Sequence, residues 1–291
     1  MKRITVGLLG AVLASTSVFA QDFSQVNITT IPVTDNIYML QGSGGNIGVS
    51  IGDDGTFIVD DQFAPLTGKI VEAIAALTDK PVDFVVNSHW HYDHSDGNEN
   101  FGKAGAYIVA QDNSRHRMET DQVVSLNGRE QEAYDASGLP KITFMDAMKF
   151  YFNGNTIEIF YTGPGHTDGD AQVYFRESNV LHTGDMFVRY GLPFIDQPNG
   201  GTTSGMIDSL WEIAGLIDDD TIIIPGHGQL AKRSDLLEYR SMLVTIRERL
   251  QAAIAQGQSA DQVVASDVVE GFAAPGAGTE RWVRAAYEEY K

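Results

Sequence analysis

The chain has 291 residues, of which 43% are apolar and 20% are charged, as in an ordinary folded protein. It contains no cysteine, which excludes disulfides, cysteine-ligated zinc, iron–sulfur clusters, thiol nucleophiles and a lipid-modified cysteine anchor. The formal net charge of −19 argues against nucleic acid and anionic membranes as partners, because a binding face would have to overcome the field of the whole molecule.

The first twenty residues have the pattern of a signal peptide. Lys2 and Arg3 give a positive start, residues 4–14 are an apolar stretch, and Val18-Phe19-Ala20 is a small-x-small cleavage site. The alternative is a membrane anchor, but the apolar run is well short of the roughly 20 residues that a membrane span needs. We therefore expect a mature chain that begins at Gln21, is periplasmic or secreted, and keeps no membrane anchor.

The first part of the mature chain is predicted to form short strands separated by glycine-rich turns, then a helix and a buried strand. Apolar or β-branched runs alternate with turn sequences at residues 41–46 and 52–55. The predicted strands are Ile37–Leu40, Ile47–Ile51, Thr56–Val59 and Val82–Val86, and the helix is Pro65–Leu77.

Strand and helix patterns alternate through the rest of the chain. Further strands are expected at Ala106–Val109, Lys149–Phe152, Thr156–Tyr161, Ala171–Phe175, Asn179–His182 and Thr221–Ile224. Helices are expected at Thr203–Leu216, Ser234–Ala255 and Thr279–Tyr290. The polar stretch Glu119–Pro140 has weak periodicity and is expected to be a long loop or a loose helix that covers something. The alternation predicts two packed sheets with helices outside.

The most informative segment is Ser88-His89-Trp90-His91-Tyr92-Asp93-His94, directly after a predicted buried strand. Side chains two residues apart point the same way in extended backbone, so His89 and His91 can share one metal ion. Asp93 and His94 lie further along and can turn toward a neighbouring ion. Imidazole and carboxylate together suit zinc, and also iron or manganese.

Two more histidines follow predicted strands in glycine-flanked turns. His166 lies in the segment 163–167 and His227 in the segment 224–228, and the glycines allow close backbone approach. Between them, the strand ending at His182 continues into Thr183-Gly184-Asp185. A carboxylate at Asp185 could bridge two cations.

Taken in order, the motifs His-x-His-x-Asp-His, Gly-His-Thr, Thr-Gly-Asp and Pro-Gly-His resemble the metallo-β-lactamase superfamily. The resemblance extends from near Asn36 to beyond His227. It implies an αββα sandwich, two mixed β-sheets flanked by helices, in a single domain over residues 21–291, with metals at one edge. It assigns His89, His91 and His166 to a first metal site, Asp93, His94 and His227 to a second, and Asp185 to a bridging role.

The resemblance also implies a reaction. Two Zn²⁺ ions, or other divalent metals, would lower the pKa of a bridging water and generate hydroxide at neutral pH. One ion would polarise a carbonyl while the other holds the leaving-group anion. Asp93 is the expected catalytic residue, which orients the hydroxide and later shuttles a proton.

Three nearby residues are candidates for supporting roles. Asp60, at the end of a strand, is expected to support a metal ligand, the alternative being a cap for the helix that follows. His182 is expected to be a packed or supporting histidine. Arg189 could clamp a substrate carboxylate, or it could be a surface charge.

Two departures bear on the substrate. Lactamases with a similar Gly-His-Thr segment carry a cysteine where Asp185 stands and a lysine where Val188 stands. We therefore expect an exported dinuclear zinc hydrolase that cleaves a carbonyl ester, lactone or amide of a small-molecule substrate, with β-lactams among the candidates. The alternative is a non-catalytic metal-binding accessory protein of a periplasmic redox or carrier system. The sequence leaves the oligomeric state open.

Overall fold

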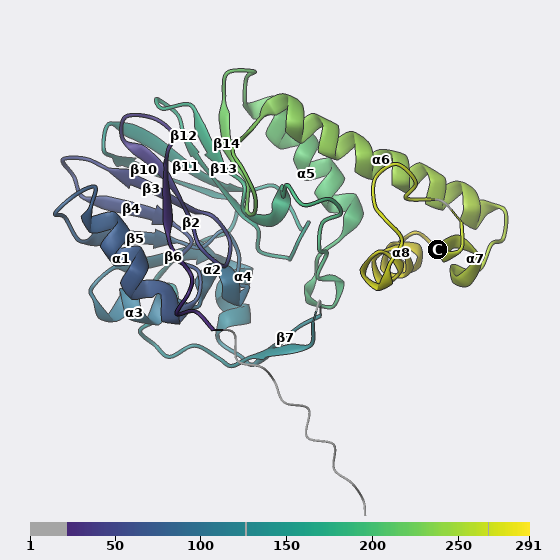
Figure 1. The fold of residues 1–291 in the computed structure, drawn as a ribbon, viewed down its shortest axis with the longest axis horizontal. Helices are drawn as coiled ribbons and strands as arrows, with labels where there is room; N and C mark the ends of the chain where they lie inside the picture. Colours follow the sequence, from purple (N-terminus) through teal and green to yellow (C-terminus); the bar gives the residue numbers. More distant parts are fainter. Residues whose placement is uncertain (1–21, 126, 267) are drawn as a thin grey trace, which may run out of the picture.

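The computed structural model describes residues 22–125, 127–266 and 268–291, so the predicted signal peptide lies outside the described residues. Two β-sheets face each other, and helices cover both outer faces (Figure 1). The first sheet has the order β1-β2-β3-β4-β5-β6-β9. Its strands are β1 (Thr29–Pro32), β2 (Ile37–Gln41), β3 (Ile47–Ile51), β4 (Thr56–Val59), β5 (Val82–Val86), β6 (Tyr107–Gln111) and β9 (Ile142–Phe144).

The second sheet has the order β10-β11-β12-β13-β14-β15. Its strands are β10 (Ala147–Phe152), β11 (Asn155–Tyr161), β12 (Ala171–Phe175), β13 (Val180–His182), β14 (Ile222–Ile224) and β15 (Ala231–Lys232). Both sheets are mixed, because β4, β5, β6 and β9 run parallel in the first and β13 and β14 run parallel in the second. The predicted αββα sandwich is therefore confirmed.

The space between the sheets is filled by alternate residues of the strands. In β4, Phe57 and Val59 face the second sheet, while Ile58 between them faces the helices on the outer side. Ile157 and Ile159 of β11 meet them from the other sheet. This period of two is what a strand with two buried faces requires.

Helices form the outer layers. They are α1 (Thr67–Ala75), α2 (Tyr92–Ser95), α3 (Asn98–Lys103), α4 (Asp112–Met118), α5 (Thr203–Leu216), α6 (Arg233–Ala255), α7 (Ala260–Val264) and α8 (Ala277–Tyr290), with 3₁₀ turns η1 (Ala64–Leu66), η2 (Gly184–Met186) and η3 (Gln197–Asn199). Helix α1 packs Ile70 and Ile74 on the first sheet. Helices α7 and α8 pack on the far half of α6, away from the sandwich (Figure 1).

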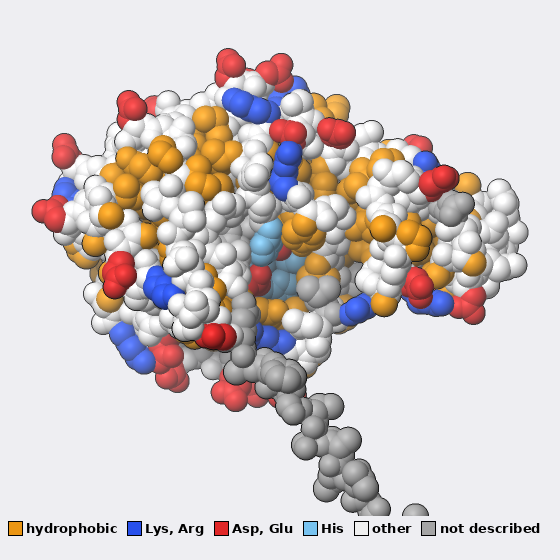
Figure 2. All heavy atoms as spheres, in the orientation of Figure 1, with side chains coloured by type: hydrophobic (Ala, Val, Ile, Leu, Met, Phe, Trp, Pro, Cys, Tyr) orange, Lys and Arg blue, Asp and Glu red, His pale blue; other side chains and the backbone are white. Residues whose placement is uncertain are grey.

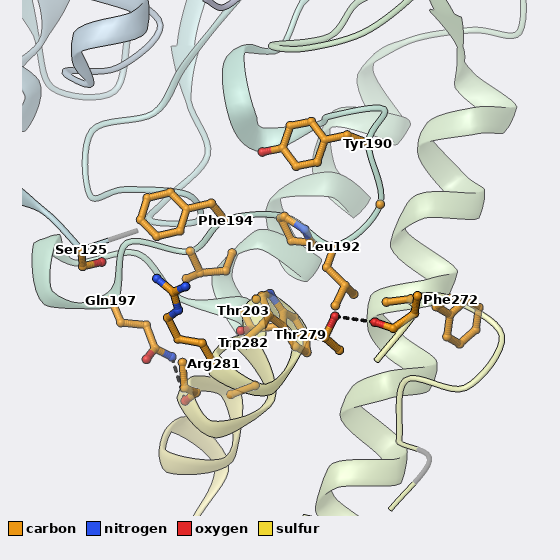
Figure 3. A pocket seen from close by; sticks show the side chains of 18 of the residues that line it. Ser125, Tyr190, Leu192, Phe194, Gln197, Thr203, Phe272, Thr279, Arg281 and Trp282 are labelled. Atoms are coloured by element: carbon orange, nitrogen blue, oxygen red, sulfur yellow. Dashed lines mark hydrogen bonds between the residues drawn. The ribbon is translucent and has the colours of Figure 1, made fainter. Parts of the chain in front are cut away.

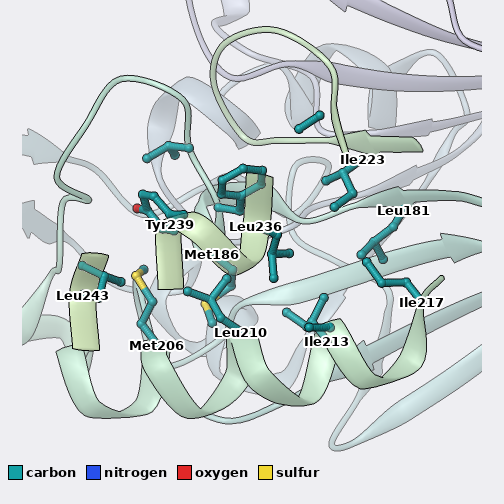
Figure 4. Packing of buried hydrophobic residues seen from close by; sticks show 14 of the residues in the cluster. Leu181, Met186, Met206, Leu210, Ile213, Ile217, Ile223, Leu236, Tyr239 and Leu243 are labelled. Carbon is teal, nitrogen blue, oxygen red and sulfur yellow. The ribbon is translucent and has the colours of Figure 1, made fainter. Parts of the chain in front are cut away.

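Helices α5 and α6 cover the second sheet through one apolar cluster (Figure 4). Leu210 and Ile213 of α5 and Leu236 of α6 are fully buried against Leu181 and Ile223 of the strands. Burying each such side chain stabilises the fold by about 1.5–3 kcal/mol. Helix α5 begins at a defined point because the Thr202 hydroxyl accepts a hydrogen bond from the Gly205 amide at 2.8 Å.

The predicted strands and the long helices are found, with ends shifted by one to two residues in most cases. The helix expected at Pro65–Leu77 starts as the 3₁₀ turn η1 and continues as α1. Glu119–Pro140 is not a loose helix: it contains the antiparallel hairpin of β7 (Gln122–Val124) and β8 (Arg129–Gln131). Strands β1, β7, β8, β9 and β15 were not predicted. Among the described residues, no helix is both long and apolar enough to cross a membrane.

Candidate metal centre

Four segments, far apart in the sequence, bring histidine and aspartate side chains to one edge of the sandwich. Strand β5 leads to His89 and His91, and α2 carries Asp93 and His94. His166 lies between β11 and β12, Asp185 in η2 after β13, and His227 after β14. Histidine side chains are visible at the bottom of a hollow in Figure 2. We call these seven side chains the histidine cluster.

The first part of the cluster consists of His89, His91 and His166, whose side-chain nitrogens lie close enough to hold one ion. The Nε2 atom of His166 lies 3.2 Å from Nε2 of His89 and 2.8 Å from Nδ1 of His91. All three residues are buried. Nitrogens this close without a shared proton or cation would repel each other through their lone pairs.

The second part consists of Asp93, His94 and His227, and Asp185 lies between the two parts. Nε2 of His94 lies 3.3 Å from Nε2 of His227. Asp185 approaches both sides: one oxygen lies 3.3 Å from His94 Nε2, and the other lies 3.7 Å from His166 Nε2 and 3.5 Å from His227 Nε2. The structure thus brings together all seven residues that the motifs singled out.

The donor set fits a divalent cation. Oδ1 of Asp185 is a buried carboxylate oxygen that accepts no hydrogen bond among the described residues. A buried anionic oxygen that accepts no hydrogen bond is costly, and a cation between it and the imidazoles would remove that cost. Imidazole nitrogens with carboxylate oxygens are ligands typical of zinc and related transition metals.

Each buried imidazole is oriented by a hydrogen bond on its second ring nitrogen. Asp60 lies 2.8 Å from His94 Nδ1, and it also accepts bonds from the amide and hydroxyl of Ser88 at 2.6 and 2.7 Å. The Ser88 hydroxyl in turn lies 3.1 Å from His89 Nδ1. Asp60 has a φ of 65°, an uncommon conformation that turns its carboxylate beneath the histidine segment. Such partners fix the tautomer and direction of ligating histidines.

The other buried imidazoles are held by the loop after η2. Asp196 Oδ2 lies 2.9 Å from His91 Nε2, and Asp196 is itself held by the hydroxyl of Ser125 at 2.6 Å. The Phe194 carbonyl lies 2.7 Å from His166 Nδ1. Ser125 follows β7, so the hairpin in the segment 119–140 supports Asp196 and, through it, His91.

Sequence reasoning did not single out Ser88, Asp170 or Asp196 as supporting residues. Asp170 accepts hydrogen bonds from the Thr167 amide and hydroxyl and from the Gly165 amide, which closes the turn that carries His166. Asp196 is far in sequence from His91. The one sequence feature that could have indicated its supporting role is its position in a loop rich in glycine and proline. Gly45 is needed for space, because a Cβ atom there would overlap the His94 ring.

Burial and neighbouring charges set the ionisation of the cluster. Burial lowers the pKa of His89 well below its ordinary value and that of His166 to about 4. Burial opposes ionisation of Asp93, but His94 and His227 outweigh it and lower the pKa of Asp93 to about 2. At neutral pH His89 and His166 therefore offer neutral nitrogens and Asp93 an ionised oxygen, as metal ligation requires.

Other predicted residues lie outside the cluster. The backbone amide of Arg189 donates a hydrogen bond to the His227 carbonyl at 3.0 Å, while its Nη1 atom lies 2.7 Å from Asp235 of α6. His182 is buried, with Nε2 3.0 Å from the Asn46 carbonyl and Nδ1 accepting from the Gly184 amide. It therefore supports the turn that carries Asp185.

The Metallo-beta-lactamase superfamily profile matches residues 40–227. A hydroxyacylglutathione hydrolase from Brucella anthropi is 26% identical over 182 residues, which are 62% of this chain and 61% of that protein. One from Brucella abortus (strain 2308) is 27% identical over 182 residues, 62% of each chain. The match thus spans about three-fifths of the length of these curated relatives.

Solved structures share the fold. The DIM-1 metallo-beta-lactamase has a TM-score of 0.62 and 21% identity, covering 76% of this chain and 99% of that one. The sec-alkylsulfatase Pisa1 from Pseudomonas sp. has a TM-score of 0.67 and 18% identity, covering 91% of this chain and 50% of that one. With the profile match over more than half of its length, this chain belongs to the metallo-β-lactamase superfamily, whose members are metal-dependent.

Proposed function

We propose that this protein is an exported hydrolase that uses two zinc ions, or similar divalent cations, to cleave a carbonyl ester, lactone or amide of a small molecule. The observation that carries the proposal is the convergence of five imidazoles and two carboxylates, with an Asp185 oxygen that accepts no hydrogen bond between the two parts of the cluster. His89, His91 and His166 would hold one ion, and Asp93, His94 and His227 the other, with Asp185 shared between them.

When bound, the cations supply Lewis-acid chemistry: they activate water near neutral pH and stabilise negative charge that develops on the carbonyl oxygen. Other residues of the chain fix the orientation of the histidine side chains that would bind these cations. Asp60 and Asp196 contact the second ring nitrogen of His94 and His91, so the other nitrogen of each ring is aimed into the cluster. No nucleophilic serine or cysteine is needed for such a reaction.

Asp93 is the residue best suited to move a proton. Its side chain is 24% exposed, whereas that of Asp185 is only 7% exposed, so Asp93 can reach both the cluster and the hollow above it. Its low pKa keeps it ionised and able to orient a water molecule. It can take the proton released on attack and return it to the leaving group, as general acid–base catalysis requires.

Several classes of substrate are candidates for this proposed hydrolase. The curated relatives are named as hydroxyacylglutathione hydrolases and the structural neighbours as metallo-β-lactamases and a sulfatase. A panel should therefore contain an acylglutathione thioester, a β-lactam, a lactone, carboxylic esters and a sulfate ester. Export through the predicted signal peptide would put the enzyme in the periplasm or outside the cell, where small-molecule substrates arrive by diffusion.

The test combines metal analysis with this panel. We expect close to two ions per chain by elemental analysis, and turnover of at least one carbonyl substrate that a chelator abolishes and added zinc restores. Bound metal without turnover of any panel member would favour the alternative of a non-catalytic accessory protein. Absence of metal after purification and after titration would refute the proposal.

A further inference from the structure

A cavity of about 740 Å³ lies between the loop that follows Asp185 and the C-terminal helices (Figure 3). One wall is the loop from Tyr190 to Pro198, and the opposite wall is the segment from Phe272 to Ala286, which includes the first half of α8. The volume falls within the range of about 300–1,000 Å³ that small-molecule sites occupy. We call this space the apolar cavity.

Two aromatic residues connect the apolar cavity with the histidine cluster. The ring of Phe194 lies 5.7 Å from that of His91, in a stacked arrangement, and 5.5 Å from that of His166. The ring of Tyr190 lies 5.7 Å from that of His227. Both aromatic residues also line the cavity. Tyr190 and Phe194 therefore border both the cluster and the cavity, which places the two sites next to each other.

The cavity lining is apolar and free of acidic groups. Leu192, Phe194, Phe272 and Trp282 supply large apolar side chains, and Arg281 is the charged residue among the described lining residues. The whole chain carries 39 Asp and Glu residues, and none of them is among the described residues that line the cavity. Such a lining suits an apolar group, and it admits an anionic end more readily than a cationic one.

We propose that the apolar cavity binds a long apolar group of the substrate, such as a medium-length acyl or alkyl chain, while the bond to be cleaved lies at the histidine cluster. This inference rests on the hydrolase function proposed above and adds a substrate class to it. The C-terminal wall lies beyond residues 40–227, the part that matches the superfamily profile. Selectivity would thus come from a region added to the catalytic fold.

The first experiment compares para-nitrophenyl acetate, butyrate and octanoate with the metal-loaded protein. Each methylene group buried contributes about fourfold to kcat/KM, so burial of only two of the six additional methylenes would make the octanoate exceed the acetate by about tenfold or more. Octyl acetate would test whether the cavity takes the alcohol side instead of the acyl side. A preference for the longer chain on either side supports the inference, and equal rates on both sides would overturn it.

A variant that fills the cavity makes the test specific. Ala285 lines the cavity from α8, and Ala285→Phe should lower kcat/KM for the octanoate about tenfold while changing the acetate less than twofold. The matched control is Ala252→Phe on the exposed side of α6, which should change neither. An equal loss for both esters, or no loss for either, would contradict the inference.

Binding can be measured without turnover. We expect anilinonaphthalene sulfonate to fluoresce on binding the metal-loaded protein, octanoate to displace it, and Ala285→Phe to abolish most of the signal. Unchanged binding by the variant would place the probe elsewhere and overturn the inference. Failure of every panel substrate with this binding intact would instead count against the proposed hydrolase function, so the two failures are distinguishable.

Discussion

The histidine cluster and the apolar cavity share Tyr190 and Phe194, but their other side chains are held in different ways. In the cluster, each buried imidazole has a hydrogen-bond partner on its second nitrogen, and Asp60 alone serves Ser88 and His94. In the cavity, apolar contacts form the walls, with hydrogen bonds such as that from Gln197 Nε2 to the Ala285 carbonyl at 3.1 Å beside them. Directional bonds fix a reaction geometry, whereas apolar walls select by size and shape. The comparison predicts that changes to the cluster abolish the reaction, while changes to the cavity alter which substrates are used.

The largest effect is expected for Asp185→Asn. Loss of one carboxylate charge between the two parts of the cluster should weaken the second metal site more than the first, and should lower kcat/KM for every substrate by about 100-fold or more. Metal stoichiometry by elemental analysis and turnover should be measured together. The fold should survive, because Asp185 lies at the sandwich edge outside the apolar clusters. Full activity with unchanged stoichiometry would mean that Asp185 is only a turn residue.

A smaller loss is expected for Asp60→Asn. The amide can accept fewer hydrogen bonds than the carboxylate, so His94 and the Ser88 amide would lose part of their support. We expect metal affinity or activity to fall by about 10–100-fold. Zinc affinity measured by competition with a chelating dye would report this directly.

Asp61 provides the matched control for Asp60. It is the next residue and is also fully buried, but its hydrogen bond comes from the Gly97 amide, at 3.0 Å. Burial raises the pKa of Asp61 well above its usual value, which favours the uncharged acid over the carboxylate, so the uncharged amide of Asp61→Asn should be tolerated. Equal loss of zinc affinity in both variants would show that Asp60 acts through general stability.

Variants of Arg189 test whether this residue, as well as the apolar cavity, determines which substrates are used. If it clamps a carboxylate, Arg189→Ala should raise KM about tenfold for carboxylate-bearing substrates and leave neutral esters unchanged. Its ion pair with Asp235 competes with that role. We therefore expect Asp235→Ala to lower KM for the same substrates, since it releases the guanidinium. Unaltered KM values in both variants would leave the apolar cavity as the main determinant of substrate choice.

The last prediction concerns stability instead of turnover, and it tests the pH dependence of the turn that carries His166. Burial raises the pKa of Asp170 to about 7, against about 3.8 in an unfolded chain. Between these values the unfolded chain binds fewer protons, so this group lowers the free energy of unfolding as pH rises, by at most about 1.4 kcal/mol per pH unit. Urea unfolding from pH 4 to 7 should show a flatter profile for Asp170→Asn than for the wild type. Parallel profiles would mean that Asp170 stays ionised when folded.

The residues of the histidine cluster could be predicted from the sequence because their information is local. Three histidines and an aspartate lie within one short segment, and His166, Asp185 and His227 each follow a strand in a glycine-containing turn. The strand and helix patterns predicted the layers for the same reason, since periodicity of two or 3.6 residues records which side is buried. Short strands such as β9 and the hairpin β7–β8 lack enough residues to show a period.

Only the tertiary structure decided what lies around the cluster. Asp196 supports His91 from a loop more than one hundred residues away, and Ser125 reaches Asp196 from a hairpin whose sequence has no marked pattern. The apolar cavity needs a loop near Phe194 and a helix near Trp282 to meet, although neither segment carries a motif. Motifs report the chemistry of neighbouring residues, whereas such contacts depend on how α6 and α8 pack against distant loops. The sequence therefore determined which groups can bind metal, and long-range packing decided how they are held and what space adjoins them.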